Sequence, residues 1–156
     1  MSVITGRRQA RPVAGEFAGG APAFEALLQA VFVAIERNDE QTLHALRVTR
    51  AEFEGFLWPE FPQSRPITNI QPEDAWAFVQ NGSLAGAGRA LGSLGGRRFT
   101  VKSIASSGPL PYTNFTLWRD IVITARDESS GEIQTLRFLP AVAERRGRFK
   151  VFSYKD

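Results

Sequence analysis

The spacing of apolar residues changes near Gly95-Gly96 and divides the chain into two parts. Before this pair, apolar residues recur every three or four positions, which is the spacing of one face of a helix. After it they come in short runs rich in Val, Ile, Phe, Thr and Tyr, separated by Gly, Pro and Ser, which is typical of antiparallel strands. The sequence therefore predicts an α+β domain in which N-terminal helices pack on a curved, mainly antiparallel, four-stranded C-terminal sheet.

The first part predicts helices separated by short breaks. The first, over residues 22–38, carries one continuous apolar stripe, and a short helix over residues 40–46 follows. A third begins at Thr49, whose hydroxyl can cap it while Glu52 reaches back to complete a capping box.

Prolines at positions 59, 62, 66 and 72 exclude a helix or a central strand over residues 59–72. A loop of this length is usually functional or held by its own side chains. A further helix is expected from Pro72, with glycines at 82, 86, 88 and 92. These glycines indicate either close approach of a neighbouring backbone or a break near Asn81-Gly82.

The second part predicts four strands, over residues 97–105, 112–126, 132–143 and 148–154. Residues 127–131 and 145–147 have turn composition, and Pro140 implies an edge position or a bulge. Consecutive strands joined in this way form a meander, in which neighbours in sequence also pair in space.

The composition limits the possible functions. The chain has 156 residues, a net charge of +3, one histidine and no cysteine, so disulfides and thiolate chemistry are excluded. We expect a flexible leader over residues 1–20 and a single domain over residues 21–156. No run approaches the ~20 apolar residues of a membrane span, and the arginine pairs mostly fall at turns, so we expect neither a membrane span nor nucleic-acid binding. A cytoplasmic and an exported location both stay open.

The order of elements, the apolar stripe of the first helix, the step "NDEQTLHAL" after it and the ending "GRFKVFSYKD" resemble the nuclear-transport-factor-2-like superfamily, over about residues 22–156. The resemblance implies a cone-shaped α+β fold whose sheet curls around the helices and leaves an apolar pocket. Some members use this pocket for catalysis and many only to dock a ligand. The isomerases need an Asp base with Tyr and protonated Asp donors, and scytalone dehydratase needs a His–Asp pair. Neither set can be carried over to this chain.

Catalytic candidates are few. His44, the one imidazole, lies beside acidic residues on a short helix, so a surface or capping role is favoured over a general base. Tyr112 and Asp120 are the other weak candidates. A single histidine cannot make a conventional metal site, and no glycine-rich segment has the pattern of a phosphate loop, so we expect no metal and no cofactor.

Arg119 and Asp120 interrupt the apolar run of the longest strand, and strand alternation places them on opposite faces. Whichever faces inward would be a buried charge in need of a partner. An Asp120–Arg137 ion pair on the solvent face is the simpler interpretation; in the other, Arg119 or Arg137 receives the carboxylate of a ligand.

Aromatic and amide side chains supply the remaining candidates for ligand binding. Tyr112, Asn114 and Trp118 either line the mouth of a pocket or pack at a corner of the sheet. Trp58 and Trp76 are further candidates, although the segment around Trp58 is better explained as a plug over the helices.

Two function classes follow. The favoured one is a small-ligand-binding or protein-interaction module, with a small apolar molecule or a carboxylate as its ligand. The alternative is a lyase or isomerase that acts by general acid–base chemistry on a small apolar substrate, using Tyr112 with Asp120 or His44. We also expect a homodimer, because one set of apolar residues on the longest strand, either Trp118 with Val122 or Leu117 with Ile121 and Ile123, must face away from the helices.

Overall fold

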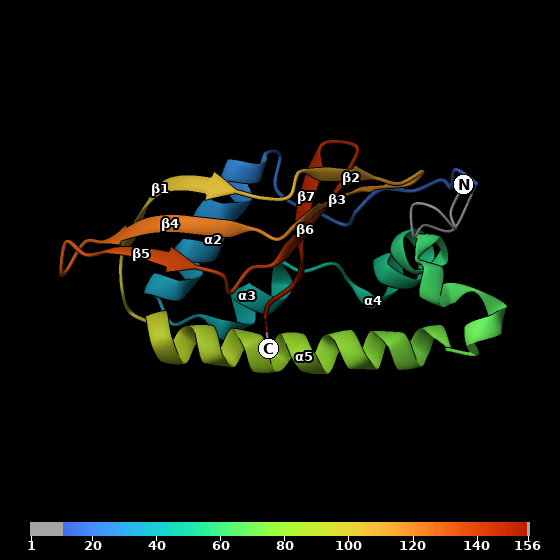
Figure 1. Cartoon of the computed structure of the whole chain (residues 1–156), viewed down its shortest axis with the longest axis horizontal. Coiled ribbons are helices and arrows are strands. Elements are labelled where there is room, and N and C mark those ends of the chain that lie inside the picture. Colours follow the sequence, from blue (N-terminus) through green and yellow to red (C-terminus); the bar gives the residue numbers. More distant parts are fainter. Residues whose placement is uncertain (1–10, 156) are drawn as a thin grey trace.

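The computed structural model describes residues 11–155. The helices precede the strands along the chain, so the prediction of an α+β fold is confirmed (Figure 1). The helices are α2 (Phe24–Glu36), α3 (Glu40–Ala45), α4 (Arg50–Glu52) and α5 (Pro72–Leu94). Between α4 and α5 lie one π-helical turn, η1 (Phe53–Leu57), and three 3-10 turns, η2 (Trp58–Glu60), η3 (Pro62–Ser64) and η4 (Pro66–Thr68).

The start of α4 has the predicted capping box. The Glu52 N–H donates to the Thr49 hydroxyl at 3.1 Å, and the Thr49 N–H donates to the Glu52 carboxylate at 2.8 Å. The prediction that residues 59–72 contain no helix is wrong in part. Each of the turns η2, η3 and η4 has a proline at its first or second position, where the missing N–H removes no helical hydrogen bond.

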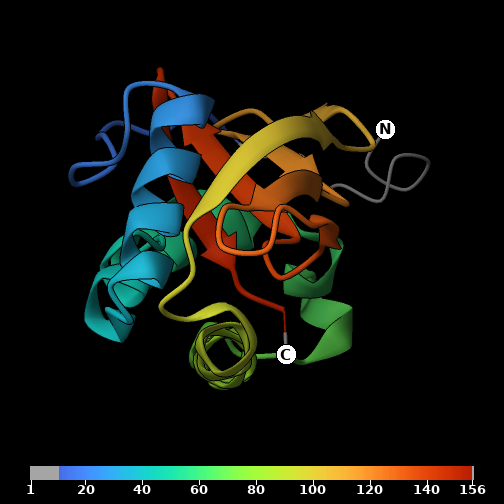
Figure 2. The same cartoon turned by 90° about the vertical axis from the view of Figure 1, so that its left-hand side faces the viewer.

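Helix α5 runs for 23 residues without a break. It lies along one side of the molecule beneath the strands, and Figure 2 shows it nearly end-on. A Cβ atom added at Gly86 would overlap the carbonyl of Lys155, so this glycine permits close approach of the C-terminal backbone. Of the two explanations for the glycines, close packing is therefore right at Gly86 and a break near Asn81-Gly82 is wrong.

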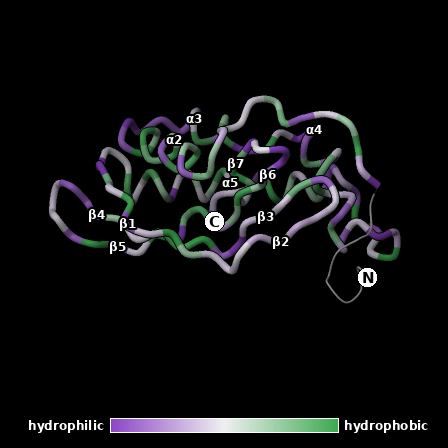
Figure 3. Tube along the Cα trace, turned by 90° about the horizontal axis from the view of Figure 1, so that it is seen from above, coloured by the Kyte–Doolittle hydropathy of each residue, from purple (hydrophilic) through white to green (hydrophobic). Residues whose placement is uncertain are grey.

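In residues 11–155, seven strands form two antiparallel sheets rather than the single four-stranded sheet expected. The strands are β1 (Phe99–Ala105), β2 (Pro109–Pro111), β3 (Thr116–Arg119), β4 (Val122–Asp127), β5 (Ile133–Leu136), β6 (Ala141–Arg145) and β7 (Arg148–Ser153). The three-stranded sheet has the order β1-β4-β5 and the four-stranded sheet the order β2-β3-β6-β7. The hydropathy colouring of Figure 3 places the hydrophilic β4–β5 turn at one tip of the molecule.

The two sheets arise because the predicted long strands bend. The run over residues 112–126 breaks at Asp120, whose φ is +53°, and the run over residues 132–143 breaks before Ala141. The Ile121 N–H donates to the Pro140 carbonyl at 3.3 Å, so the two breaks lie side by side. Both strands pass from one sheet to the other at this level. The meander order is retained, because β3 and β4 pair with β6 and β5 respectively.

The core has two clusters of buried apolar residues. The first packs α2, α3 and α5 against strands of both sheets and includes Tyr154, whose hydroxyl donates to the Leu43 carbonyl at 2.7 Å. Burial raises the pKa of this phenol. The second cluster surrounds η1 and η2 and contains Phe53, Leu57 and Trp58. This second cluster forms the floor of the site described next.

Candidate functional site

An apolar pocket of about 520 Å³ opens between the proline-rich segment and the N-terminal half of α5. Ala75 and Val79 of α5 form one side of it, and Ile70 lies at its edge. Two polar side chains, Gln63 and Asp74, also line it, and five aromatic side chains form most of the remainder: Phe53, Trp58, Phe61, Phe78 and Phe152. We call this the aromatic pocket.

The floor of the aromatic pocket is a packed group of rings. Phe53 stacks on Trp58 and on Phe152, with centroid distances of 6.0 and 6.2 Å and interplanar angles of 28° and 24°. Phe61 meets Phe152 edge-on at 6.1 Å. Contacts of this kind hold aromatic rings in defined orientations, so the floor is preorganised.

The outer wall is made by the proline-rich segment, which is tied by its own hydroxyl groups. The Ser64 hydroxyl donates to the Phe61 carbonyl at 2.7 Å, and the Thr68 hydroxyl donates to the Gln63 carbonyl at 2.6 Å. These bonds close successive tight turns between α4 and α5. Of the two expectations for this segment, functional or held by its own side chains, the second is confirmed by these bonds.

Exposure rises steeply from the floor to the rim. Phe53 is 1% exposed and Trp58 9%, whereas Ile70 is 41% and Phe78 82% exposed. A phenylalanine this exposed at the rim of an apolar pocket presents apolar area that a bound molecule could cover.

Arg47, which was not identified from the sequence, contacts residues of the two elements β7 and α5 that flank the pocket. Its Nε donates to the Phe152 carbonyl at 3.1 Å, its Nη1 donates to Gln80, and its guanidinium lies 5.3 Å from the centre of the Trp76 ring. Burial lowers the pKa of Arg47 to about 10. It therefore connects β7 and α5, which carry two walls of the pocket.

The two tryptophan candidates have different places. Trp58 lines the aromatic pocket, so the segment around it, which was interpreted as a plug over the helices, also forms part of the pocket lining. Trp76 does not line it. The Trp76 ring packs against Phe53 at 5.5 Å, behind the floor.

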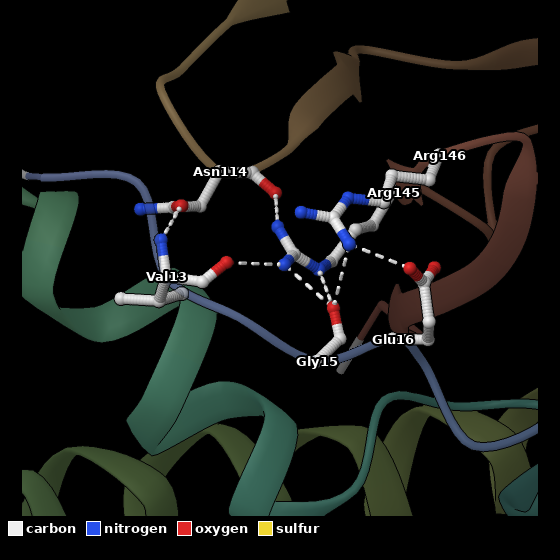
Figure 4. Close-up of polar contacts among 6 residues, drawn as sticks. All are labelled: Val13, Gly15, Glu16, Asn114, Arg145 and Arg146. Atoms are coloured by element: carbon white, nitrogen blue, oxygen red, sulfur yellow. Dashed lines mark hydrogen bonds and ion pairs between the residues drawn. The ribbon is translucent and has the colours of Figure 1, made fainter.

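Asn114 is a structural residue that holds the segment before α2 (Figure 4). Its side chain accepts the Val13 N–H at 2.8 Å and donates to the Arg11 carbonyl at 3.0 Å. Beside it, the Arg145 guanidinium donates to the carbonyls of Val13 and Gly15 at 2.8 and 2.6 Å. The side-chain amide of Asn114 is thus occupied by hydrogen bonds within the chain.

Further contacts fix the same segment. Phe17 is 4% exposed in the second core cluster, and the Ala18 N–H donates to the Glu52 carboxylate at 2.5 Å. The prediction of a flexible leader over residues 1–20 did not include these contacts of residues 11–20, because their partners are distant in sequence. Residues 1–10 lie outside the described part.

The other ligand-binding candidates lie away from the aromatic pocket. Tyr112 stacks on Phe115 at 4.5 Å, and Trp118 meets Phe24 edge-on at 5.9 Å. Arg119 is exposed, and Arg137 lines a separate shallow groove beside α5. Packing at sheet corners is therefore the better description of Tyr112 and Trp118.

The charges on the longest predicted strand are not buried. Both Arg119 and Asp120 are exposed, because the bend at Asp120 interrupts strand alternation. Within residues 11–155, no ion pair joins Asp120 to Arg137.

The three catalytic candidates are not brought together. His44 is half-buried on α3, and its Nε2 lies 3.9 Å from a Glu40 carboxylate oxygen. Asp120 lies in the bend between the sheets, and Tyr112 is stacked on Phe115. None of them lines the aromatic pocket, and no hydrogen bond joins any two of them in the described part of the chain.

Sequence reasoning missed Ile70, Asp74 and Phe78. The available signal was the length of the proline-rich segment, which marked this region as functional or self-tied. The spacing does not show that Phe78 borders a pocket, because this depends on what the rest of the chain leaves uncovered.

No protein-family model, curated protein or solved structure matches this chain. In the described residues, no helix combines the length and apolar character needed to cross a bilayer. The same residues contain no group of three or more His, Cys, Asp or Glu side chains placed to hold a metal ion.

Proposed function

We propose that this protein is a ligand-binding module of the nuclear-transport-factor-2-like type, which takes up a small apolar molecule in the aromatic pocket. The order of helices followed by a bent antiparallel meander supports the family part of the proposal. The pocket supports the binding part, since small-molecule sites are typically concave, mostly apolar and roughly 300–1,000 Å³ in volume.

The observation that carries the proposal is a preorganised aromatic floor beneath an exposed apolar rim. Phe53 and Trp58 are fixed by stacking, whereas Phe78 at the rim is 82% exposed. Covering apolar area of this kind is favourable by about 25 cal/mol per Å². A lyase or isomerase finds less support, because its candidate residues Tyr112, Asp120 and His44 do not line the pocket. The one described carboxylate that does, that of Asp74, is exposed.

The proposal is tested with the neutral fluorescent probe N-phenyl-1-naphthylamine. We expect saturable binding with a rise in probe fluorescence and a change in tryptophan emission, because Trp58 lines the pocket. Ala75→Phe fills the space beside the floor, so the ligand loses apolar contact with the pocket. The dissociation constant should rise at least about tenfold.

Ala85→Phe is the matched control, since Ala85 is exposed on the same helix and does not line the pocket. Both variants should keep the wild-type melting temperature within a few degrees. Absence of saturable binding, or equal affinity of Ala75→Phe and wild type, would contradict the proposal.

A further inference from the structure

We infer that the aromatic pocket prefers ligands that carry a positive charge on an apolar body, such as an organic amine or a quaternary ammonium ion. The inference rests on the proposed function, because it concerns the ligand of the same pocket. Two independent features of the lining lead to it: the negative charge of the one ionisable side chain among its described residues, and the chemistry of its rings.

Asp74 is the one ionisable residue that lines the pocket among the described residues. It is exposed in the first turn of α5, where the helix dipole favours a carboxylate. Within residues 11–155 no ion pair engages this carboxylate. The helix dipole explains why an acid stands here, but no cation among the described residues neutralises it, so a cationic ligand can.

The aromatic rings favour the same sign of charge. The faces of Phe, Tyr and especially Trp rings attract cations through their quadrupole. The chain already uses this property nearby, since Arg145 lies 4.1 Å from the centre of the Phe56 ring and Arg47 lies 5.3 Å from that of Trp76. One face of the Trp58 ring stacks on Phe53, and no described Lys or Arg occupies its other face, so the part of the ring that lines the pocket can contact a ligand.

These features predict a preference and not an absolute requirement. A neutral apolar ligand gains the same burial but leaves the Asp74 carboxylate without a partner, and an anionic ligand is repelled by it. An exposed ion pair together with one cation–π contact corresponds to about a tenfold preference for the cation.

The experiment displaces N-phenyl-1-naphthylamine from the full chain with decyltrimethylammonium, decanol and decanoate, each below its micelle concentration and at low ionic strength. We expect the cation to displace the probe at about tenfold lower concentration than the alcohol, with decanoate the weakest. Added salt should reduce the difference, because it screens the contribution of an exposed carboxylate. Asp74→Asn should lower the advantage of the cation several-fold and leave displacement by decanol unchanged.

Glu73→Gln is the matched control, since Glu73 is exposed in the same helical turn and does not line the pocket. It removes the same charge and should keep most of the cation preference. Equal displacement by all three compounds, or an equal effect of the two substitutions, would overturn this inference while the proposed function stands. Failure of the probe itself to bind would overturn the proposed function and this inference with it.

Discussion

At the scale of single residues, Lys150 and Glu52 form a buried ion pair. The Lys150 Nζ lies 2.8 and 3.0 Å from the two carboxylate oxygens of Glu52, and the side chains are 4% and 5% exposed. Burial alone would raise the pKa of the Glu52 carboxyl. Hydrogen bonds from Lys150 and from the N–H groups of Thr49 and Ala18 outweigh it and lower this pKa below its usual value.

Lys150→Met should therefore lower the free energy of unfolding by about 3–5 kcal/mol at pH 7, because it leaves a charged carboxylate buried without its partner. Urea denaturation measures this directly. Lys102→Met is the matched control: Lys102 is exposed on β1, and its substitution should change the stability by less than about 0.5 kcal/mol.

The pH dependence of the same variant has a definite sign. In the wild type the pKa of Glu52 is lower in the folded state than in the unfolded state. The carboxylate therefore contributes fully to the free energy of unfolding above the unfolded pKa, near 4.3. This contribution is lost as the pH falls through the folded pKa. In Lys150→Met the unpaired carboxylate is relieved by protonation. The gap in stability between the two proteins should narrow from pH 7 to pH 4, and a constant gap would contradict this account of the pair.

At the scale of elements, two glycines of α5 allow the effect of packing on stability to be compared with the effect of helix propensity. Gly86→Ala gains about 1 kcal/mol of propensity but brings a Cβ onto the Lys155 carbonyl. We expect a net loss of about 1–3 kcal/mol. Gly92→Ala, on the same helix with nothing within 4 Å of the added atom, should instead stabilise the protein by about 0.4–1 kcal/mol. Thermal denaturation of the two variants checks the signs, and a stabilised Gly86→Ala would refute the close approach.

The elements differ in how far local sequence determines them. The capping box at Thr49 and the turns over residues 127–131 and 145–147 depend on neighbouring residues, and the sequence predicted all of them. The division into two sheets was not predictable, because Asp120 stands inside an apolar strand pattern and adopts a positive φ only through the bend that both long strands share. Pro140, at the other break, was the local residue that indicated an irregularity in these strands.

At the scale of the whole molecule, the site depends on contacts that the sequence does not display. The aromatic pocket joins Phe53, Phe78 and Phe152, which are distant in sequence and meet only when α5 and β7 are in place. Asn114 was a candidate from its position beside aromatic residues. Its actual partners, Arg11 and Val13, lie about a hundred residues away and could not be inferred from spacing.

The homodimer stays a prediction, but the structure changes the surface we propose for it. Ile121 is 2% exposed and Trp118 packs on Phe24, so the strip expected on the longest strand is largely covered and Ile121→Glu would unfold the protein rather than dissociate it. The rim of the aromatic pocket is the more suitable patch, because Ile70 and Phe78 are exposed together there. A second copy and a ligand would then compete for the same rim.

A two-fold axis through this rim would let the same apolar residues of two copies cover each other. We therefore expect light scattering at micromolar concentration to give about twice the chain mass of 17.2 kDa, and Phe78→Asp to return it to the monomer value, because an unpaired charge in a desolvated contact is costly. Ile133→Asp is the matched control, since Ile133 is 54% exposed on β5 and lies outside the pocket. A mass near 17.2 kDa that does not change with concentration would exclude the dimer, and equal dissociation by both substitutions would exclude this surface.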